Sequence, residues 1–137
     1  MENECIFCKI AEGKIPATKV HEDDKLLAFM DIAPANVGHT LIIPKAHHEI
    51  LTDIPDGLLT DMTLLTKKIA RATLSALGAE GFNVMMNNKE VAGQVVPHAH
   101  IHIIPRYKGD GQQIHIAPNP RAAASVDETA EKIKKFL

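Results

Sequence analysis

The chain has 137 residues, 45% of them hydrophobic, which is enough for one domain that buries a core without disulfide staples. Its 17 acidic residues exceed its 15 basic ones by only two, and this balance excludes the broad positive field of a protein that binds nucleic acid or an anionic membrane. No apolar run reaches the roughly 20 residues of a membrane span, and the first ten residues lack the pattern of a signal peptide, so we expect a cytoplasmic protein.

The first features along the chain are a pair of cysteines and a short amphipathic turn over residues 8–12. Cys5 and Cys8 have the C-x-x-C spacing. In a reducing compartment this spacing suggests a metal or redox site before it suggests a structural disulfide.

Three later segments predict the strands of a sheet. Apolar residues are frequent in three segments, residues 25–32, 39–45 and 82–88. Each segment is flanked by glycines, prolines or other turn-forming residues. Between the second and the third segment, apolar residues recur at spacings of three and four from Leu58 to Ala76, and Gly78 follows them. This pattern predicts one long helix that ends at the glycine and lays its apolar stripe on the sheet.

The last predicted element is a second, shorter helix, since Ser125 and Glu128 have the spacing of a capping box. Its apolar side includes Ile133, Phe136 and Leu137. No repeat or linker divides the sequence, so we expect residues 1–137 to form a single domain. Runs of strands with one long helix between them favour the α+β class with a mainly antiparallel sheet.

The most unusual stretch is VVPHAHIHIIPRY, residues 95–107, in which His98, His100 and His102 stand at every second position. On a strand, alternate side chains share a face, so the three imidazoles would lie on one side and apolar residues on the other. A solvated sheet face would accept threonine, lysine or glutamate as readily. Three histidines in register therefore indicate a functional role, either in metal binding or in catalysis.

Two kinds of chemistry suit this row of histidines. An H-x-H pair can chelate one zinc ion, but His98 and His102 would lie about 13 Å apart, which strains a site that uses all three. Alternatively, a neutral imidazole can attack phosphorus and form a covalent intermediate that water cleaves. The preceding turn favours phosphorus, because N–H groups near Gly93 and Gln94 can form an anion-binding nest and Asn87 can add an amide donor.

The segment HAHIHII resembles the signature of the histidine triad (HIT) family of nucleotide hydrolases and transferases. The resemblance extends to CIFCKIAEGKIPATKVHEDDKLLAFMDIAPANVGHTLIIPKAHH, then to Asn87, and then to AGQVVPHAHIHIIPRY, all in the family order. It covers residues 4–107 and leaves residues 108–137 as an unsupported C-terminal extension. It implies a HIT-like fold and a purine nucleotide as substrate.

The resemblance also implies roles for single residues. His100 matches the nucleophile that attacks the α-phosphate and forms a nucleotidyl-histidine, and His102 matches the residue that contacts the phosphate or assists the leaving group. Asp31 matches the acidic residue that takes the ribose hydroxyls, and His39 matches a histidine near the site. The other positions implied to bind the nucleotide are Asn87, Gly93, Gln94 and Val95 at the phosphate, and Phe7, Phe29, Ile32, Ile6 and Ile10 around the base.

Two positions distinguish this chain within the family. Family members often have serine where Val95 stands, so only the backbone N–H is expected to serve there. The transferase branch resembles H-x-H-x-Q, whereas His102 occupies the last position here, which favours hydrolysis. The branch most similar to this chain cleaves nucleoside 5′-phosphoramidates. The alternatives are a dinucleoside polyphosphate hydrolase, a nucleotide-binding interaction protein with little turnover, and a metalloenzyme with a catalytic zinc on the histidine strand.

Some family members carry C-x-x-C and complete a zinc site with two histidines. The resemblance implies Cys5, Cys8, His47 and His98 as the ligands, with His48 as an alternative to His47 by sequence alone. Two thiolates and two imidazoles leave no open position in a tetrahedral site, which describes a structural zinc ion. The resemblance further implies a homodimer, because family members of this length usually pair through the long helix and a sheet edge.

Overall fold

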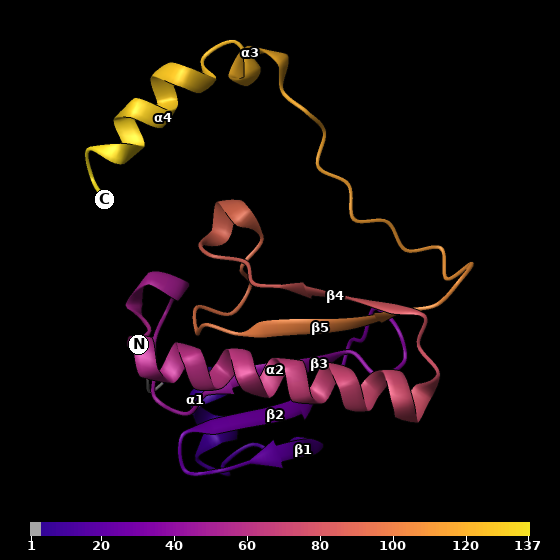
Figure 1. The fold of residues 1–137 in the computed structure, drawn as a ribbon. Coiled ribbons are helices and arrows are strands. Elements are labelled where there is room, and N and C mark those ends of the chain that lie inside the picture. Colours follow the sequence, from indigo (N-terminus) through magenta and orange to yellow (C-terminus); the bar gives the residue numbers. More distant parts are fainter. Residues whose placement is uncertain (1–3) are drawn as a thin grey trace.

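The computed structural model describes residues 4–137, and its sheet in that range is antiparallel throughout (Figure 1). The five strands described follow the order β1-β2-β3-β5-β4. Their bounds are Lys19–Glu22 for β1, Leu26–Met30 for β2, Thr40–Pro44 for β3, Gly81–Met85 for β4 and Ile101–Arg106 for β5. The predicted α+β class and antiparallel sheet are confirmed, and β5 lies inside the sheet between β3 and β4.

The long helix α2, Asp56–Leu77, covers one face of the sheet. Its residues Met62, Leu65 and Ile69 belong to the larger core cluster, which also contains buried residues of β2, β3 and β5. Gly78 ends the helix with a φ of 64°, a left-handed conformation that glycine adopts without strain. The predicted helix and its terminal glycine are therefore confirmed.

A short helix, α1 (Ile6–Ala11), packs on the residues of β2 and β3 that face away from α2. Phe7 and Ile10 join a second core cluster there. The helix starts before the predicted turn, because the Cys5 sulfur accepts a hydrogen bond from the Cys8 N–H and caps the first turn. This cap fixes one cysteine at the start of the helix and the other within it.

Two features of the sheet differ from the sequence prediction. β1 is not predicted, because this four-residue edge strand has mostly exposed side chains. β5 begins at Ile101, so only His102 of the three histidines belongs to the hydrogen-bonded strand. The backbone just before β5 is hydrogen-bonded to a loop and not to a strand, since the Ala99 N–H donates to the His48 carbonyl. The 3₁₀ turn η2 (Leu51–Asp53) precedes α2, and the 3₁₀ turn η3 (Glu90–Ala92) follows β4.

Beyond β5 the chain forms the helices α3 (Pro120–Ala123) and α4 (Val126–Lys134), which stand away from the sheet in Figure 1. The predicted closing helix is present. The prediction of a capping box at its start is wrong, because the Ser125 side chain makes no capping hydrogen bond and its hydroxyl donates to the Ala122 carbonyl. Phe136 is 91% exposed, so the predicted apolar side is not packed on the sheet. No helix within residues 4–137 combines the length and apolar character needed to cross a membrane.

Candidate functional site

The three histidines of residues 98–102 lie close together in different surroundings. His98 is fully buried, His100 is 6% exposed and His102 is half-buried. The ring centroids of His100 and His102 are 4.8 Å apart, whereas the His98 ring packs against His47 at 5.0 Å. The predicted row of imidazoles therefore divides into two neighbouring groups.

A backbone carbonyl fixes the tautomer of His100. The Nδ1–H of His100 donates to the His98 carbonyl oxygen over 2.7 Å, so the lone pair of the neutral ring is on Nε2. Burial lowers the pKa of His100 below its ordinary value and keeps the ring neutral near pH 7. A neutral imidazole with its lone pair on Nε2 is a competent nucleophile.

A chain of hydrogen bonds also fixes the tautomer of His102. The Ala35 N–H donates to Nδ1 of His39 at 3.0 Å, so the neutral His39 ring carries its proton on Nε2. That Nε2–H donates to Nδ1 of His102, again at 3.0 Å, which leaves the His102 proton on Nε2. Burial, and then the neighbouring His100 and His39, lower the pKa of His102 to about 4. His102 therefore presents an N–H donor beside His100.

Asp31 lies next to this chain of hydrogen bonds. Its Oδ2 is 3.6 Å from Nε2 of His39, and its Oδ1 accepts a hydrogen bond from the Ala33 N–H. Asp31, His39 and His102 are close enough to share a cation. However, the Ala35 N–H uses the lone pair of His39 at Nδ1, so Nε2 holds a proton instead of a lone pair for a metal. The group is better suited to sharing a proton than to binding a metal.

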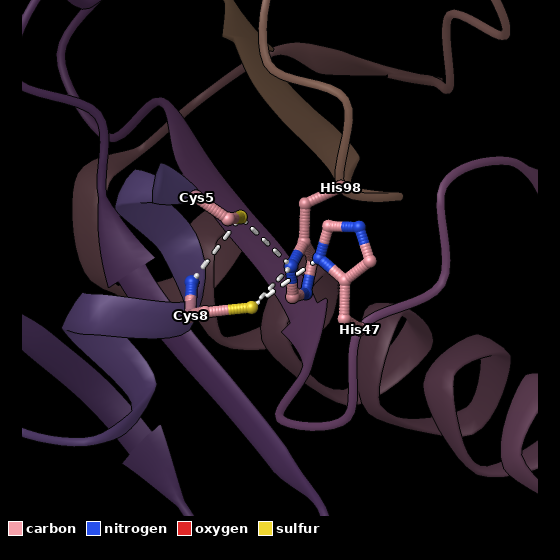
Figure 2. A group of neighbouring side chains, drawn as sticks. All are labelled: Cys5, Cys8, His47 and His98. Atoms are coloured by element: carbon pink, nitrogen blue, oxygen red, sulfur yellow. Dashed lines mark hydrogen bonds between the residues drawn. The ribbon is translucent and has the colours of Figure 1, made fainter. Parts of the chain in front are cut away.

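A second group of four side chains could hold a metal ion: Cys5, Cys8, His47 and His98 (Figure 2). Nδ1 of His98 lies 3.4 Å from the Cys5 sulfur and 3.5 Å from the Cys8 sulfur. Nδ1 of His47 lies 3.3 Å from the Cys8 sulfur. A tetrahedral ion with ligand bonds of about 2.0–2.3 Å separates its ligand atoms by about 3.3–3.8 Å. The four side chains therefore have the spacing of a closed metal site.

The tautomer of His98 fits such a site. Its Nε2–H donates to the Pro44 carbonyl oxygen at 2.7 Å, so Nδ1 carries the lone pair and faces both sulfurs. Burial lowers the pKa of His98 to about 4, which keeps that lone pair available at neutral pH. His47, and not the neighbouring His48, belongs to the group of four.

The residues predicted around a base are only partly assembled. The rings of Phe7 and Phe29 are buried and pack edge to face with their centroids 5.5 Å apart. The Phe7 ring also lies 5.0 Å from the His100 ring. In contrast, Ile32 is 98% exposed, so its side chain stands at the rim and outside the packed group.

The turn predicted to hold a phosphate uses much of its own hydrogen-bonding capacity. The N–H groups of Gly93 and Gln94 donate to the carbonyls of Glu90 and Lys89. The Gln94 side chain accepts from the Lys89 N–H and donates to the Glu49 carbonyl. The Asn87 side chain reaches the Gly93 carbonyl only at 3.4 Å, and the Val95 side chain is 89% exposed. Of the predicted donors, those best placed for an anion are therefore the Asn87 side chain and the backbone N–H of Val95.

The sequence prediction does not include the three backbone groups that fix the tautomers of the histidine rings. They are the N–H of Ala35 and the carbonyls of Pro44 and His98. A backbone group has no side-chain signature, so no motif could have indicated them. His39 was expected only to lie near the site, and its hydrogen bond to His102 assigns it a definite contact.

The sequence model of the HIT domain family matches residues 12–109 of this chain. An uncharacterized HIT-like protein of Methanocaldococcus jannaschii is 46% identical over 130 residues, which are 95% of this chain and 98% of that protein. An adenosine 5′-monophosphoramidase of Saccharomyces cerevisiae is 43% identical over 137 residues, which are 100% of this chain and 83% of that protein.

Solved structures show the same fold. A protein of Streptococcus mutans matches with a TM-score of 0.90 at 41% identity, over 98% of this chain and 85% of that one. A zinc-bound histidine triad family protein of Mycobacterium smegmatis matches with a TM-score of 0.78 at 36% identity, over 94% of this chain and 99% of that one.

Proposed function

The chain belongs to the HIT domain family, and from this premise we propose that it hydrolyses nucleotide conjugates. The expected substrate is a purine nucleoside 5′-phosphoramidate or a related conjugate, from which the enzyme releases a nucleoside monophosphate. The adenosine 5′-monophosphoramidase of yeast supports this substrate class, because its similarity to this chain extends over all 137 residues.

The observation that carries the proposal is the complementary tautomers of His100 and His102. His100 has its lone pair on Nε2, and His102 has a proton on Nε2. Their ring centroids are 4.8 Å apart. Displacement at phosphorus needs one nucleophile and one proton donor at neighbouring positions, which these two neutral rings supply.

In the proposed reaction, Nε2 of His100 attacks the α-phosphorus. A bond from phosphorus to His100 forms while the P–N bond of the phosphoramidate breaks, and the leaving amine takes the proton from Nε2 of His102 as solvent returns a proton to that nitrogen, so that His102 stays neutral. Water then attacks the nucleotidyl-histidine, the bond to His100 breaks, and the proton that water loses passes to solvent. Both histidines are neutral again when the nucleoside monophosphate leaves.

The remaining predicted residues would orient the nucleotide. The carboxylate of Asp31 is proposed to accept hydrogen bonds from the ribose hydroxyls, and the amide of Asn87 to donate to the phosphate. Phe7 and Phe29 are proposed to border the base. Because these aromatic walls offer shape and few hydrogen bonds, we expect weak discrimination among purine bases.

The direct test is to incubate the protein with adenosine 5′-phosphoramidate and measure AMP release. Intact-protein mass spectrometry should detect an AMP adduct that disappears in His100→Ala, and this variant should lose at least about 10³-fold in kcat. His115→Ala is the control, since His115 is exposed. Unchanged turnover by His100→Ala would show that the covalent route is wrong.

A parallel incubation with a diadenosine polyphosphate addresses the alternatives. Faster cleavage of that compound than of the phosphoramidate would favour a dinucleoside polyphosphate hydrolase. Binding of AMP without cleavage of either compound would favour a nucleotide-binding interaction protein.

We also propose that Cys5, Cys8, His47 and His98 hold a structural zinc ion. The ion would join α1 to the segments before β5 and after β3, and with four protein ligands it would activate no water. The zinc-bound mycobacterial relative and the lone pair of His98 support this identity. Two thiolate ligands fit the reducing conditions of the cytosol, where we expect the protein to work. Metal analysis should find the zinc lost from a Cys5→Ser, Cys8→Ser variant, and full retention would mean that the ion binds elsewhere.

A homodimer is proposed from the free edge of the sheet. β4 is an edge strand, and its Phe82 and Val84 are 40% and 50% exposed. Together with Leu74 and Ala70 of α2 they line one apolar hollow. An exposed apolar edge strand is a template for pairing with another chain, so a second copy is expected to cover this surface.

A further inference from the structure

The nucleophile candidate His100 touches a residue that lies between two of the metal ligands in the sequence. Phe7 stands in α1 between Cys5 and Cys8 and is only 7% exposed. Its ring lies 5.0 Å from the His100 ring, with an interplanar angle of 89°. It also makes edge-type contacts with the rings of His98 at 5.9 Å and Phe29 at 5.5 Å. Phe7 is therefore a wall against which the His100 ring packs.

The position of this wall depends on the helix that carries it. α1 has six residues, and a helix of this length does not persist in water by its own hydrogen bonds. Cys5 caps the helix and Cys8 lies within it, and both sulfurs face Nδ1 of His98. An ion at this site would therefore hold α1, and with it Phe7, against the sheet.

The second contact of His100 depends less on such an ion. Nδ1–H of His100 donates to the His98 carbonyl, and His98 is anchored separately by its hydrogen bond to Pro44. Removal of the ion leaves this anchor in place. Of these two contacts of His100, Phe7 is the one carried by α1, the helix that such an ion would hold.

We propose that Phe7 is a positioning residue for His100, and that metal binding at Cys5, Cys8, His47 and His98 acts on turnover through it. With the ion bound, α1 is fixed and Phe7 restricts the His100 ring to one orientation. Without the ion, α1 loosens, the ring samples other orientations, and fewer of them aim Nε2 at phosphorus. The kinetic part of this proposal rests on the proposed hydrolysis.

The test combines Phe7→Leu with removal of the metal. Phe7→Leu keeps an apolar side chain and removes the ring, and Ile43→Val is the control, because it removes one methylene from the same core cluster. Each protein is prepared with zinc and after chelation, and its zinc content is measured. The readouts are kcat and KM for adenosine 5′-phosphoramidate, and the ¹⁵N signals of the His100 ring at a fixed pH.

The expected result for the parent is a fall in kcat of about tenfold on chelation, with broadened His100 signals. Zinc-loaded Phe7→Leu should show a similar fall in kcat and similar broadening, and chelation should then lower its kcat little further. Any rise in KM reports the proposed base contact of Phe7 and should be the same with and without zinc. Ile43→Val should respond to chelation as the parent does.

Two results would overturn the inference. If Phe7→Leu raises KM and leaves kcat and the His100 signals unchanged, Phe7 is only a contact for the base. If chelation lowers kcat by the same factor in the parent and in Phe7→Leu, the ion does not act through Phe7. If the parent cleaves no nucleotide, the proposed function fails instead, and the ¹⁵N signals with and without zinc still decide whether Phe7 couples the metal site to His100.

Discussion

His39 determines which nitrogen of His102 carries a proton. Its own Nδ1 accepts from the Ala35 N–H, so it can only donate through Nε2, and His102 must accept at Nδ1. The His102 proton is thereby directed to Nε2, where a leaving group would need it. In the proposed reaction His39 therefore acts through His102 and needs no contact with the substrate.

The substitution His39→Ala should therefore lower kcat about tenfold with KM changed less than about twofold, because His102 would populate both tautomers. Steady-state kinetics with adenosine 5′-phosphoramidate and the ¹⁵N shifts of His102 measure the two effects. His21→Ala is the matched control, since His21 is another histidine beside a carboxylate, with Nε2 2.8 Å from Oδ2 of Asp23, but it lies on β1. Unchanged kcat in His39→Ala would contradict the role of this hydrogen bond.

Among the elements, the start of β3 and the end of α2 meet at a glycine. Gly38 has a φ of 94°, and a Cβ there would lie 2.5 Å from Cδ1 of Leu77 and 3.0 Å from Cγ of Pro105. Both the backbone conformation and the space therefore favour glycine at this junction.

The substitution Gly38→Ala should lower the free energy of unfolding by about 2 kcal/mol, because it adds backbone strain and a steric contact. Urea unfolding measures this change. Gly57→Ala is the opposite control: Gly57 lies in the first turn of α2 with nothing within 4 Å of its added Cβ, so stability should stay the same or rise slightly. Equal effects of the two substitutions would refute the argument.

Burial explains which elements the sequence predicts most directly. β2 and β3 are buried along almost their whole length and appear as short apolar runs, α2 is buried along one stripe and appears as a helical spacing, and Gly78 marks the helix end. β1 is mostly exposed, so its sequence shows no pattern of buried residues. The predicted capping box fails because the Ser125 hydroxyl donates to the nearby Ala122 carbonyl and does not cap the helix N-terminus. At the candidate site, the resemblance predicted the side chains, but their tautomers depend on backbone groups, some from distant segments, such as Pro44 for His98. Such pairings exist only in the folded chain.

For the whole molecule, the buried histidines predict a loss of stability in mild acid. The pKa values of His98 and His102 are lowered from 6.5 to about 4 by burial, and that of His100 is lowered in the same direction. Between about pH 6.5 and pH 4 the unfolded chain binds protons that the folded chain does not, so the free energy of unfolding falls as pH falls.

The free energy of unfolding of the metal-free protein, measured in urea, should therefore drop between pH 7 and pH 5, by on the order of 1 kcal/mol for each of His98 and His102. His102→Ala should weaken this pH dependence, and the exposed His115→Ala should leave it unchanged. Equal free energies of unfolding at the two pH values would contradict the assignment of neutral, buried rings.

The two edges of the sheet provide a test of the proposed dimer. Val84 on β4 and Val20 on β1 are each 50% exposed. Val84→Glu should shift the mass measured by light scattering from dimer to monomer, because it places a charge in the apolar surface shared with α2, whereas Val20→Glu should not. A monomeric parent would refute the dimer, and a monomer formed only by Val20→Glu would place the contact at the other edge.

The contacts of His98 determine which substitutions at the candidate metal site the protein can tolerate. Its N–H donates to Val96, its Nε2–H to Pro44, its Nδ1 faces both cysteine sulfurs, and its carbonyl accepts from His100. Every hydrogen-bonding group of this residue is committed, so a substitution here would disturb the proposed metal site and the core packing in a single step. The affinity of the proposed site is more readily adjusted at His47, whose ring is half-buried, and we expect substitutions that tune it to accumulate there.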